Sequence, residues 1–560
     1  MSERKGENAL SDGPEPTRIP FWRMMFDHSG ITSDVINYQY QGSGTKDDPH
    51  IVTWIPNDPR NPMLLNKKFK WSIAVFEALS TTAVALVSSA YTGGMDQIIE
   101  EFGIDRQVAI LGVALYVLGF AVGPLLWAPL GELFGRQIMF FITFLGLTAF
   151  NCGAAGSPNA RTLIVLRFLA GSFGASTFTN AGGVIADIFE ASDRGLAMGI
   201  YSTAPFLGPV TGPIIGGFLG KAAGWRWILG FLGALTGFFW ILGCALVPET
   251  YAVVLLRRRA EKLSKITGKV YMSRKDAEMG EVSVQSSLGT ALSRPWILLV
   301  KEPIVLLLSL YMAIIYGTLY LFFAAFPIVY QQHRGWDQGI GSLPFLGLLI
   351  GMIIAIIYCI PENKRYIRIV ERNNGLAPPE ARLLPAMVGS IPLPIGLFWF
   401  AWTNGPEIHW LASVAAGIPF GFGMVLVFLS VMNYLVDAYT IFAASVLGAN
   451  TFLRSIFGAV FPLIATYMYN NLGIHWASTI LAFLSLVCVP FPFLFYRYGS
   501  VIRQKCAYAA EAAAHMKGLQ HDESSQNEQS DGTLLEIPRS NSVPPATVEQ
   551  EKDAREQTSS

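Results

Sequence analysis

The sequence predicts an all-α membrane protein of twelve transmembrane helices in two bundles of six, and three observations support this prediction. First, 52% of the 560 residues are hydrophobic and only 14% are charged, whereas a soluble domain carries about 25% charged residues. Second, apolar stretches recur along most of the chain, long enough to form helices of about 20 residues that cross a bilayer. Third, one long polar loop, at 249–302, divides these stretches into two sets.

Eleven apolar stretches define the predicted helices in order along the chain. The last, 438–496, contains one charged residue, Arg454, and is interrupted by the polar sequence Asn470-Asn471-Leu472-Gly473. It therefore predicts two helices, which brings the total to twelve. The other ten stretches contain no Asp, Glu, Lys or Arg: 78–95, 107–131, 137–160, 168–186, 195–220, 227–248, 303–333, 338–361, 383–406 and 408–436.

These stretches divide the chain into five regions. We expect a polar N-terminal segment at 1–70, a six-helix bundle at 71–248, a central loop at 249–302, a second six-helix bundle at 303–497 and a disordered tail at 498–560. The tail is rich in Ser, Glu and Gln and shows no apolar periodicity, which is typical of disorder. Two bundles of six helices around a site near the middle of the membrane are a known transporter layout.

Charged residues in the loops predict the orientation of the chain. The central loop is rich in Lys and Arg, including Arg257-Arg258-Arg259, whereas the connection at 96–106 is acidic. Because positively charged loops stay on the cytoplasmic side, we expect both termini and the central loop in the cytoplasm. Within that loop, residues 251–269 are amphipathic and are expected to form a helix on the inner leaflet or, alternatively, to bind a partner.

Composition and motifs argue against several other classes of protein. Lys and Arg together number 40, as do Asp and Glu, so no basic excess indicates nucleic-acid binding. The five cysteines are isolated, the histidines lack partners at helical spacing, and Gly42-Ser-Gly44-Thr-Lys46 is too short for a phosphate-binding loop. We therefore expect no enzymatic activity, no cofactor and no metal site.

The fifth predicted helix contains the strongest motif. Its sequence reads Gly208-Pro-Val-Thr-Gly212-Pro213-Ile-Ile-Gly216-Gly217. Glycines four residues apart share one helix face, with a rise of about 6 Å between them, and a face without side chains lets another helix approach closely. The prolines remove backbone donors and favour a bend. We interpret this helix as a hinge or sealing surface between the bundles; ordinary packing of small residues is the alternative.

The pattern G-x-x-x-G-P-x-x-G-G resembles the antiporter motif of the major facilitator superfamily. Further segments resemble other motifs of the superfamily, namely Ala128–Arg136 between helices 2 and 3, Leu166–Gly171, Gly183–Asp187 and Arg194–Met198. The first of them departs from the pattern G-x-L-x-D-R-x-G-R-R at Ala128, Glu132, Leu133 and Gln137. Asp58–Pro62, Lys67–Trp71 and Val247–Tyr251 are similar to the fungal twelve-span drug:proton antiporter branch, and the resemblance covers about residues 55–500.

Three ionisable residues inside predicted helices are candidates for proton coupling: Arg167, Glu77 and Arg454. Intramembrane charges are expensive and usually face the bundle interior. Arg167 faces the interior or snorkels from a helix end, and in the family the corresponding arginine is thought to tune proton coupling. A carboxyl group at Glu77 in a site of low dielectric could load and release protons; an exposed carboxylate at the inner interface is the alternative. Arg454 is a core charge or an interfacial anchor.

Charges at the cytoplasmic helix ends suggest a gate. The candidates are Glu132, Gly135, Arg136, Asp187 and Arg194. Their shared placement and the family pattern suggest an ion-pair set that breaks and reforms as the bundles rock. The alternative is isolated surface charges, each worth about 0–1 kcal/mol. Asp437 ends helix 10 much as Asp187 ends helix 4, which hints at an internal repeat.

The seventh helix contains the main candidates for substrate binding. Tyr316 and Tyr320 share one face, with Gly317 between them. Aromatic faces with hydroxyl tips suit flat or amphipathic organic compounds, although plain lipid or core packing is the alternative. Asn433 and Tyr434, at the end of helix 10, are further candidates.

The resemblance implies a carrier that works by alternating access. We expect a monomer in the plasma membrane that exports small amphipathic organic compounds, such as drugs, fungicides, toxins or secondary metabolites, driven by the proton gradient and without a cofactor. An uptake permease or facilitator for a metabolite such as a polyamine or organic acid is the nearest alternative. A transporter-like receptor is another; large cytoplasmic signalling extensions would be its sign, and the tails here are modest.

Overall fold

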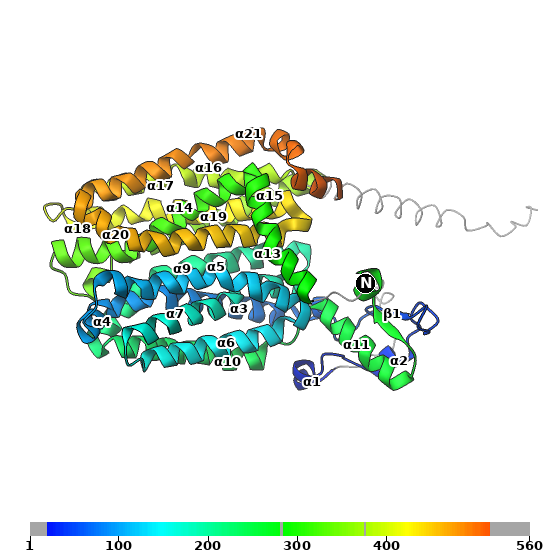
Figure 1. The fold of residues 1–560 in the computed structure, drawn as a ribbon. Coiled ribbons are helices and arrows are strands. Elements are labelled where there is room, and N and C mark those ends of the chain that lie inside the picture. The colour runs from blue at the N-terminus through cyan, green and yellow to red at the C-terminus, as the bar shows by residue number, and fades with distance from the viewer. Residues whose placement is uncertain (1–18, 280–283, 374–376, 516–560) are drawn as a thin grey trace, which may run out of the picture.

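Most helices of the protein run along a common direction, in two groups that follow each other in the sequence (Figure 1). The computed structural model describes residues 19–279, 284–373 and 377–515. Backbone polar groups have no water to bind in hydrocarbon, so long apolar stretches must satisfy their own hydrogen bonds as helices. Helices α1, α2 and α11 gather at one end of the groups, called here the loop end, and the opposite end is the far end.

The first bundle contains six crossings. It begins earlier than residue 71, because the side chain of Asn66 accepts a hydrogen bond from the Lys68 amide and caps the first helix. Its elements are α3 (Lys67–Ala90) with η2 (Tyr91–Gly94) and α4 (Met95–Phe102), α5 (Arg106–Phe134), α6 (Arg136–Ala155), α7 (Ala160–Gly174) with α8 (Ser176–Ile188), α9 (Ala191–Ala223) and α10 (Trp225–Leu246).

The second bundle contains the other six crossings and continues beyond residue 497. Its elements are α14 (Pro303–Phe326) with the π-helix η3 (Pro327–His333), η4 (Ile340–Ser342) with α15 (Phe345–Arg372), η5 (Pro379–Leu383) with α16 (Leu384–Ser390) and α17 (Pro392–Thr403), α18 (Trp410–Ala415) with α19 (Gly417–Tyr439), and η6 (Thr440–Phe442) with α20 (Ala443–Cys488) and α21 (Pro490–Lys505). Helix α20 holds one crossing before Gly473 and begins a second after it, which α21 completes.

The structure confirms the twelve predicted crossings. Among the described residues, nine stretches are long and apolar enough to span a membrane. The last of these, Trp410–Lys505, holds three crossings, because the chain reverses after α19 and again at Gly473. Gly473 has a φ of 74°, which a residue with a side chain rarely adopts. The glycine-rich α9 is not among the nine but packs along α3 and supplies the remaining crossing.

The predicted disordered tail is wrong at its start. Helix α21 continues to Lys505, and residues 507–515 are also helical. Both guanidinium contacts from Arg503 to the Glu380 carboxylate are 2.9 Å long, and Cys506 is buried. The start of the predicted tail differs in composition from the rest, because residues 498–515 are rich in alanine and carry apolar side chains that favour and pack a helix. Residues 516–560 lie outside the described part of the chain.

The N-terminal segment and the central loop form one folded unit at the loop end, called here the loop-end unit (residues 19–66 with 252–279). Strands β1 (His50–Val52) and β2 (Tyr271–Ser273) pair in parallel, with His50 opposite Tyr271. The other elements of this region are α1 (Phe21–Phe26), α2 (Ser33–Asn37), η1 (Pro62–Leu64), α11 (Ala252–Thr267) and α12 (Arg274–Met279), and α13 (Val284–Lys301) then leads to the second bundle. The predicted amphipathic helix exists, but the apolar side chains of Ala260 and Leu263 pack on the N-terminal segment.

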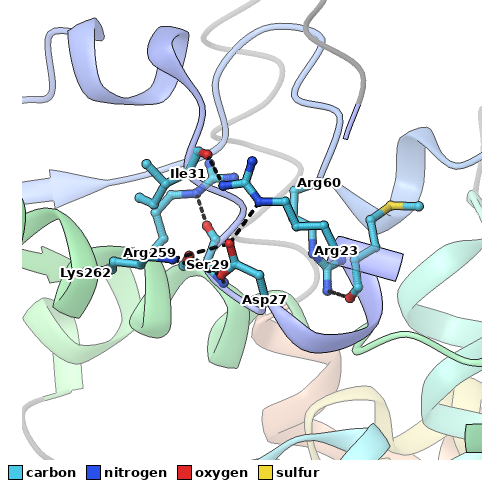
Figure 2. A network of polar contacts seen from close by, with 8 residues as sticks. Arg23, Asp27, Ser29, Ile31, Arg60, Arg259 and Lys262 are labelled. Carbon is cyan, nitrogen blue, oxygen red and sulfur yellow. Dashed lines mark hydrogen bonds and ion pairs between the residues drawn. The ribbon is translucent and has the colours of Figure 1, made fainter. Parts of the chain in front are cut away.

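Buried charges hold this unit together (Figure 2). Arg259 on α11 is 1% exposed; its Nη2 donates to Asp58 Oδ1 at 3.1 Å and its Nε to the Ser29 carbonyl at 3.1 Å. Nearby, Asp27 accepts from Lys262 at 3.3 Å. Burial raises the pKa of Asp27, but hydrogen bonds from Ser29 and the charge of Lys262 more than offset this and lower it to about 2. The N-terminal segment is therefore tied to α11 by specific ionic contacts.

Candidate functional site

Buried polar side chains meet in the middle of the protein, where the two bundles touch. We call this group the central cluster and define it as Ser88 on α3, Arg167 on α7, Tyr316 and Tyr320 on α14, and Arg454 on α20. All five are at most 3% exposed. The cluster brings together two of the three predicted proton-coupling residues and the first two predicted substrate-binding residues.

Arg167 is buried, and each nitrogen of its guanidinium donates a hydrogen bond. Tyrosine rings face its guanidinium, with centroid distances of 5.0 Å to Tyr91 and 4.3 Å to Tyr116. Desolvated cation–π contacts of this kind are favourable. The alternative of a snorkelling side chain is wrong, because the residue is 0% exposed. Its three nitrogens donate to the backbone carbonyls of Gly112 at 3.0 Å, Val87 at 3.0 Å and Ser88 at 3.1 Å.

Tyr316 and Tyr320 connect the bundles through their hydroxyl groups. They lie one helical turn apart, so they share a face as predicted. The Tyr320 hydroxyl lies 2.8 Å from Ser88 Oγ of the first bundle, and the Tyr316 hydroxyl donates to Tyr320 at 3.3 Å. Between them, Gly317 leaves space that the Phe461 ring fills. In this state both tyrosines contact protein rather than an open cavity.

Arg454 is also an interior charge, but its hydrogen-bonding capacity is not satisfied. It is 3% exposed, so the alternative of an interfacial anchor is wrong. Its guanidinium lies between the rings of Tyr316, at 4.8 Å, and Phe428, at 5.0 Å. Buried nitrogens Nε and Nη1 have no hydrogen-bond partner in the described part of the protein. Rings therefore flank a cation that has no anionic partner in the part of the chain that the structure describes.

Glu77, the third proton-coupling candidate, is buried in α3. It is 1% exposed, so the alternative of an exposed carboxylate at the inner interface is wrong. Both carboxylate oxygens lack a hydrogen-bond partner among the described residues. An ionised carboxylate in such a place costs several kcal/mol in lost hydration, and a neutral carboxylic acid avoids that cost.

The predicted gate residues do not form a single set of ion pairs. Arg136 Nε lies 3.4 Å from Asp187 Oδ2, but both residues belong to the first bundle. Arg194 Nε donates to the Phe189 carbonyl at 3.4 Å, and Glu132 is exposed without an ion-pair partner among the described residues. The alternative of isolated charges therefore holds for Glu132 and Arg194, and these residues form no latch between the bundles in this state.

Glu249 organises the loop around Arg136 and was missed as a site residue. Its carboxylate accepts from the backbone amides of Arg136 at 3.0 Å and Gln137 at 3.1 Å, at the start of α6. A carboxylate is stabilised at a helix N-terminus by the free amides and the helix dipole. Gly135 has a φ of 104°, and a side chain there would collide with Glu249. Glu249 belongs to the motif Val247–Tyr251, but nothing in the sequence links this motif to a loop 113 residues earlier.

The second bundle repeats the first at this position. Arg382 Nε lies 2.8 Å from Asp437 Oδ2, and the Tyr366 hydroxyl contacts the same carboxylate at 3.2 Å. Asp437 at the end of α19 thus pairs as Asp187 does at the end of α8. This agrees with the internal repeat suggested by the sequence.

The glycine motif of α9 packs within the first bundle and also reaches the seam between the bundles, so it combines the two roles considered from the sequence. A side chain at Gly208, Gly212 or Gly216 would overlap α3, so these glycines allow close packing within the first bundle. Gly217 instead faces Gln338 and Ser342 of the second bundle. The motif is therefore mainly a packing surface, and its last glycine lies at the seam between the bundles.

The bundles are joined by polar contacts at the centre and at the far end. Lys221 Nζ lies 3.1 Å from Asp337 Oδ2, and the Gln338 side chain donates to the Gly93 carbonyl. With the Ser88–Tyr320 contact, these are the polar contacts between the bundles over the described ranges. The structure thus represents a state that is closed at the far end.

Two predicted substrate-binding residues lie apart from the central cluster. Asn433 is exposed. Tyr434 is buried, and its hydroxyl lies near Gly499 on α21, in the region where Arg503 pairs with Glu380. Their position at the end of α19 was predicted correctly, but the structure does not bring them to Tyr316 and Tyr320.

Comparison with known proteins agrees with this architecture. The chain is 63% identical over 531 residues to the MFS-type efflux pump MFS2 of Trichophyton rubrum, covering 94% of this chain and 89% of the relative. It is 60% identical over 504 residues to the Major facilitator superfamily multidrug transporter mdrA of Aspergillus fumigatus, covering 90% and 83%.

A solved structure and a family description complete the comparison. The partially occluded inward-open xylose transporter XylE from E. coli shares the fold, with a TM-score of 0.54 and 15% identity, covering 77% of this chain and 99% of that chain. The description of the Major Facilitator Superfamily matches residues 78–462. Twelve crossings, a glycine-rich fifth helix and these matches agree: the chain is a multi-pass membrane transporter that belongs to the Major Facilitator Superfamily.

Proposed function

We propose that this transporter exports small amphipathic organic compounds across the plasma membrane in exchange for protons, without converting them chemically. The central cluster is the observation that carries the proposal. It places buried ionisable groups and aromatic rings where the two bundles touch, so that rocking of the bundles would change their access to each side. Two relatives at 60–63% identity are named as an efflux pump and a multidrug transporter, which supports the direction of transport.

In this proposal the loop end faces the cytoplasm. The basic loops lie at that end, in agreement with the positive-inside rule. Parting of the bundles at the loop end, with the far end closed, would then admit substrate from the cytoplasm. Opening toward the outside would require breaking the Lys221–Asp337, Gln338–Gly93 and Ser88–Tyr320 contacts. The exposed Lys221–Asp337 pair is weak, so the closed state is not held by strong ionic contacts.

Glu77 is the proposed proton-binding group. Its buried and unpartnered carboxyl group would be neutral in this state and would release its proton when the site opens to the other side. Export against a gradient is energetically feasible, because one charge crossing 100 mV gains about 2.3 kcal/mol, equivalent to about fifty-fold accumulation. Arg167 would hold α3, α5 and α7 together around this exchange.

Reconstituted liposomes test the proposal. The probes are 2-naphthoate, 2-naphthamide and 2-naphthylmethylamine, which share one ring system and are detected by its fluorescence. Protein-free liposomes give the baseline, because the neutral forms of the acid and the amine already distribute with the pH gradient. Above that baseline, we expect a pH gradient to drive uphill movement of at least one probe, and Glu77→Gln to abolish this while retaining exchange of probe across the membrane. Transport of the wild type that ignores the pH gradient would contradict proton coupling.

A further inference from the structure

The guanidinium of Arg454 has no counter-ion among the described residues. Over residues 19–279, 284–373 and 377–515, it forms no ion pair, and Nε and Nη1 have no acceptor. Glu77 does not supply the missing charge, since its own carboxylate oxygens lack partners too. Removing a guanidinium from water is costly unless an anion or several acceptors replace the water. The position therefore favours a state in which an external anion is bound.

The groups around Arg454 are mainly aromatic and come from both bundles. Phe428 on α19 and Tyr316 on α14 cover the guanidinium. Phe206, from α9 of the first bundle, packs edge-on against Phe428 with centroids 4.3 Å apart and lies 6.2 Å from the Tyr316 ring. Separation of the bundles would part Phe206 from the other two rings and open a slot beside Arg454. A flat ring could then enter between Phe206 and the other two rings.

We propose that Arg454 binds the anionic group of the transported compound, and that Tyr316, Phe428 and Phe206 hold its aromatic body. The substrates are then aromatic organic acids. This inference rests on the proposed transport function and specifies its substrate class. A guanidinium and a carboxylate form strong charge-assisted hydrogen bonds, often in pairs. Aromatic faces bind flat rings by stacking or by edge contacts.

Binding of matched probes to the full-length protein in detergent micelles tests the inference by calorimetry. We expect 2-naphthoate to bind about 10- to 100-fold more tightly than 2-naphthamide, the range for hydrogen bonds to a charged group. Arg454→Gln should remove this preference, and Arg454→Lys should retain part of it. Tyr311→Phe is the matched control: this buried tyrosine of α14 packs against Phe491 instead, and the variant should keep the full preference.

Two outcomes would overturn the inference. One is equal or weaker binding of 2-naphthoate relative to 2-naphthamide or 2-naphthylmethylamine by the wild type, a comparison that needs no variant to fold. The other is an undiminished preference in folded Arg454→Gln. Failure of the transport proposal is distinguishable: 2-naphthoate would bind in an Arg454-dependent manner, yet a pH gradient would move no probe beyond the protein-free baseline. Conversely, pH-driven movement of the amine without binding of 2-naphthoate would refute only the substrate class.

Discussion

Arg167 and Arg454 are both buried within the membrane-spanning helices, but they differ in the hydrogen-bond partners that surround them. Arg167 donates to three carbonyls and lies over two tyrosine rings. Arg454 has two aromatic rings, and two of its nitrogens lack partners. The same side chain is thus a fixed connector of helices in the first bundle and an unsatisfied charge in the second. Burial alone does not show the role of a charged residue. Whether its hydrogen-bond donors have acceptors within the protein is more informative.

The largest effect is expected where a satisfied buried charge loses its partner completely. Asp58→Asn removes the counter-ion of Arg259 in the loop-end unit, where both side chains are at most 1% exposed. Leaving a buried charge unpaired costs about 3–5 kcal/mol, so residues 19–66 should become more susceptible to limited proteolysis. Asp276→Asn, at the more exposed pair with Arg257, is the control and should cost only about 0–1 kcal/mol. Equal susceptibility of the two variants would contradict this reading.

Arg167→Met should be the next most damaging change. It removes three charge-assisted hydrogen bonds that tie α7 to α3 and α5. Part of the lost free energy is recovered, because methionine, unlike arginine, carries no charge that burial strips of water. We expect a net loss of about 2–4 kcal/mol, measured as a lower melting temperature in detergent micelles. An unchanged melting temperature would show that these hydrogen bonds do not hold the helices together.

Arg454→Met should change stability in the opposite direction. Replacing an unpaired buried charge by an apolar side chain of similar length is often neutral or stabilising, here by about 1–2 kcal/mol. The same thermal measurement in the same detergent checks this directly. A loss of stability equal to that of Arg167→Met would mean that the two arginines do not differ as proposed.

The smallest effect concerns a charge that remains partly solvated. The pKa of Asp27 is lowered to about 2, so its contribution to stability is complete above the unfolded-state pKa near 4 and is lost as the pH falls toward 2. Screening by water limits this contribution to below about 1 kcal/mol. Thermal unfolding between pH 6 and 3 should therefore show a slightly smaller acid destabilisation in Asp27→Asn than in the wild type. Identical pH profiles would show that Asp27 is not ionically stabilised.

The sequence was sufficient for the crossings and insufficient for the contacts between them. Hydrocarbon requires long uncharged helices, so charge-free runs revealed the twelve crossings and Gly473 marked the last break. No local pattern shows which face of α3 is buried, so Glu77 was as compatible with an exposed position as with a buried one. The Asp58–Arg259 pair joins residues 201 apart, and the contact of Glu249 with Arg136 spans 113. Such pairings depend on tertiary structure that composition and spacing do not encode.

One measurement tests most directly whether Arg454 binds the anionic group of a ligand. It is the thermal unfolding of the wild type and of Arg454→Met, each with and without saturating 2-naphthoate. A ligand that binds only the folded state raises its stability, by about 2.7 kcal/mol at one hundred times the dissociation constant. We expect that Arg454→Met starts at the same or a higher melting temperature than the wild type and does not respond to 2-naphthoate, whereas the wild type is stabilised by it. A variant that starts lower and is stabilised as much as the wild type would contradict it.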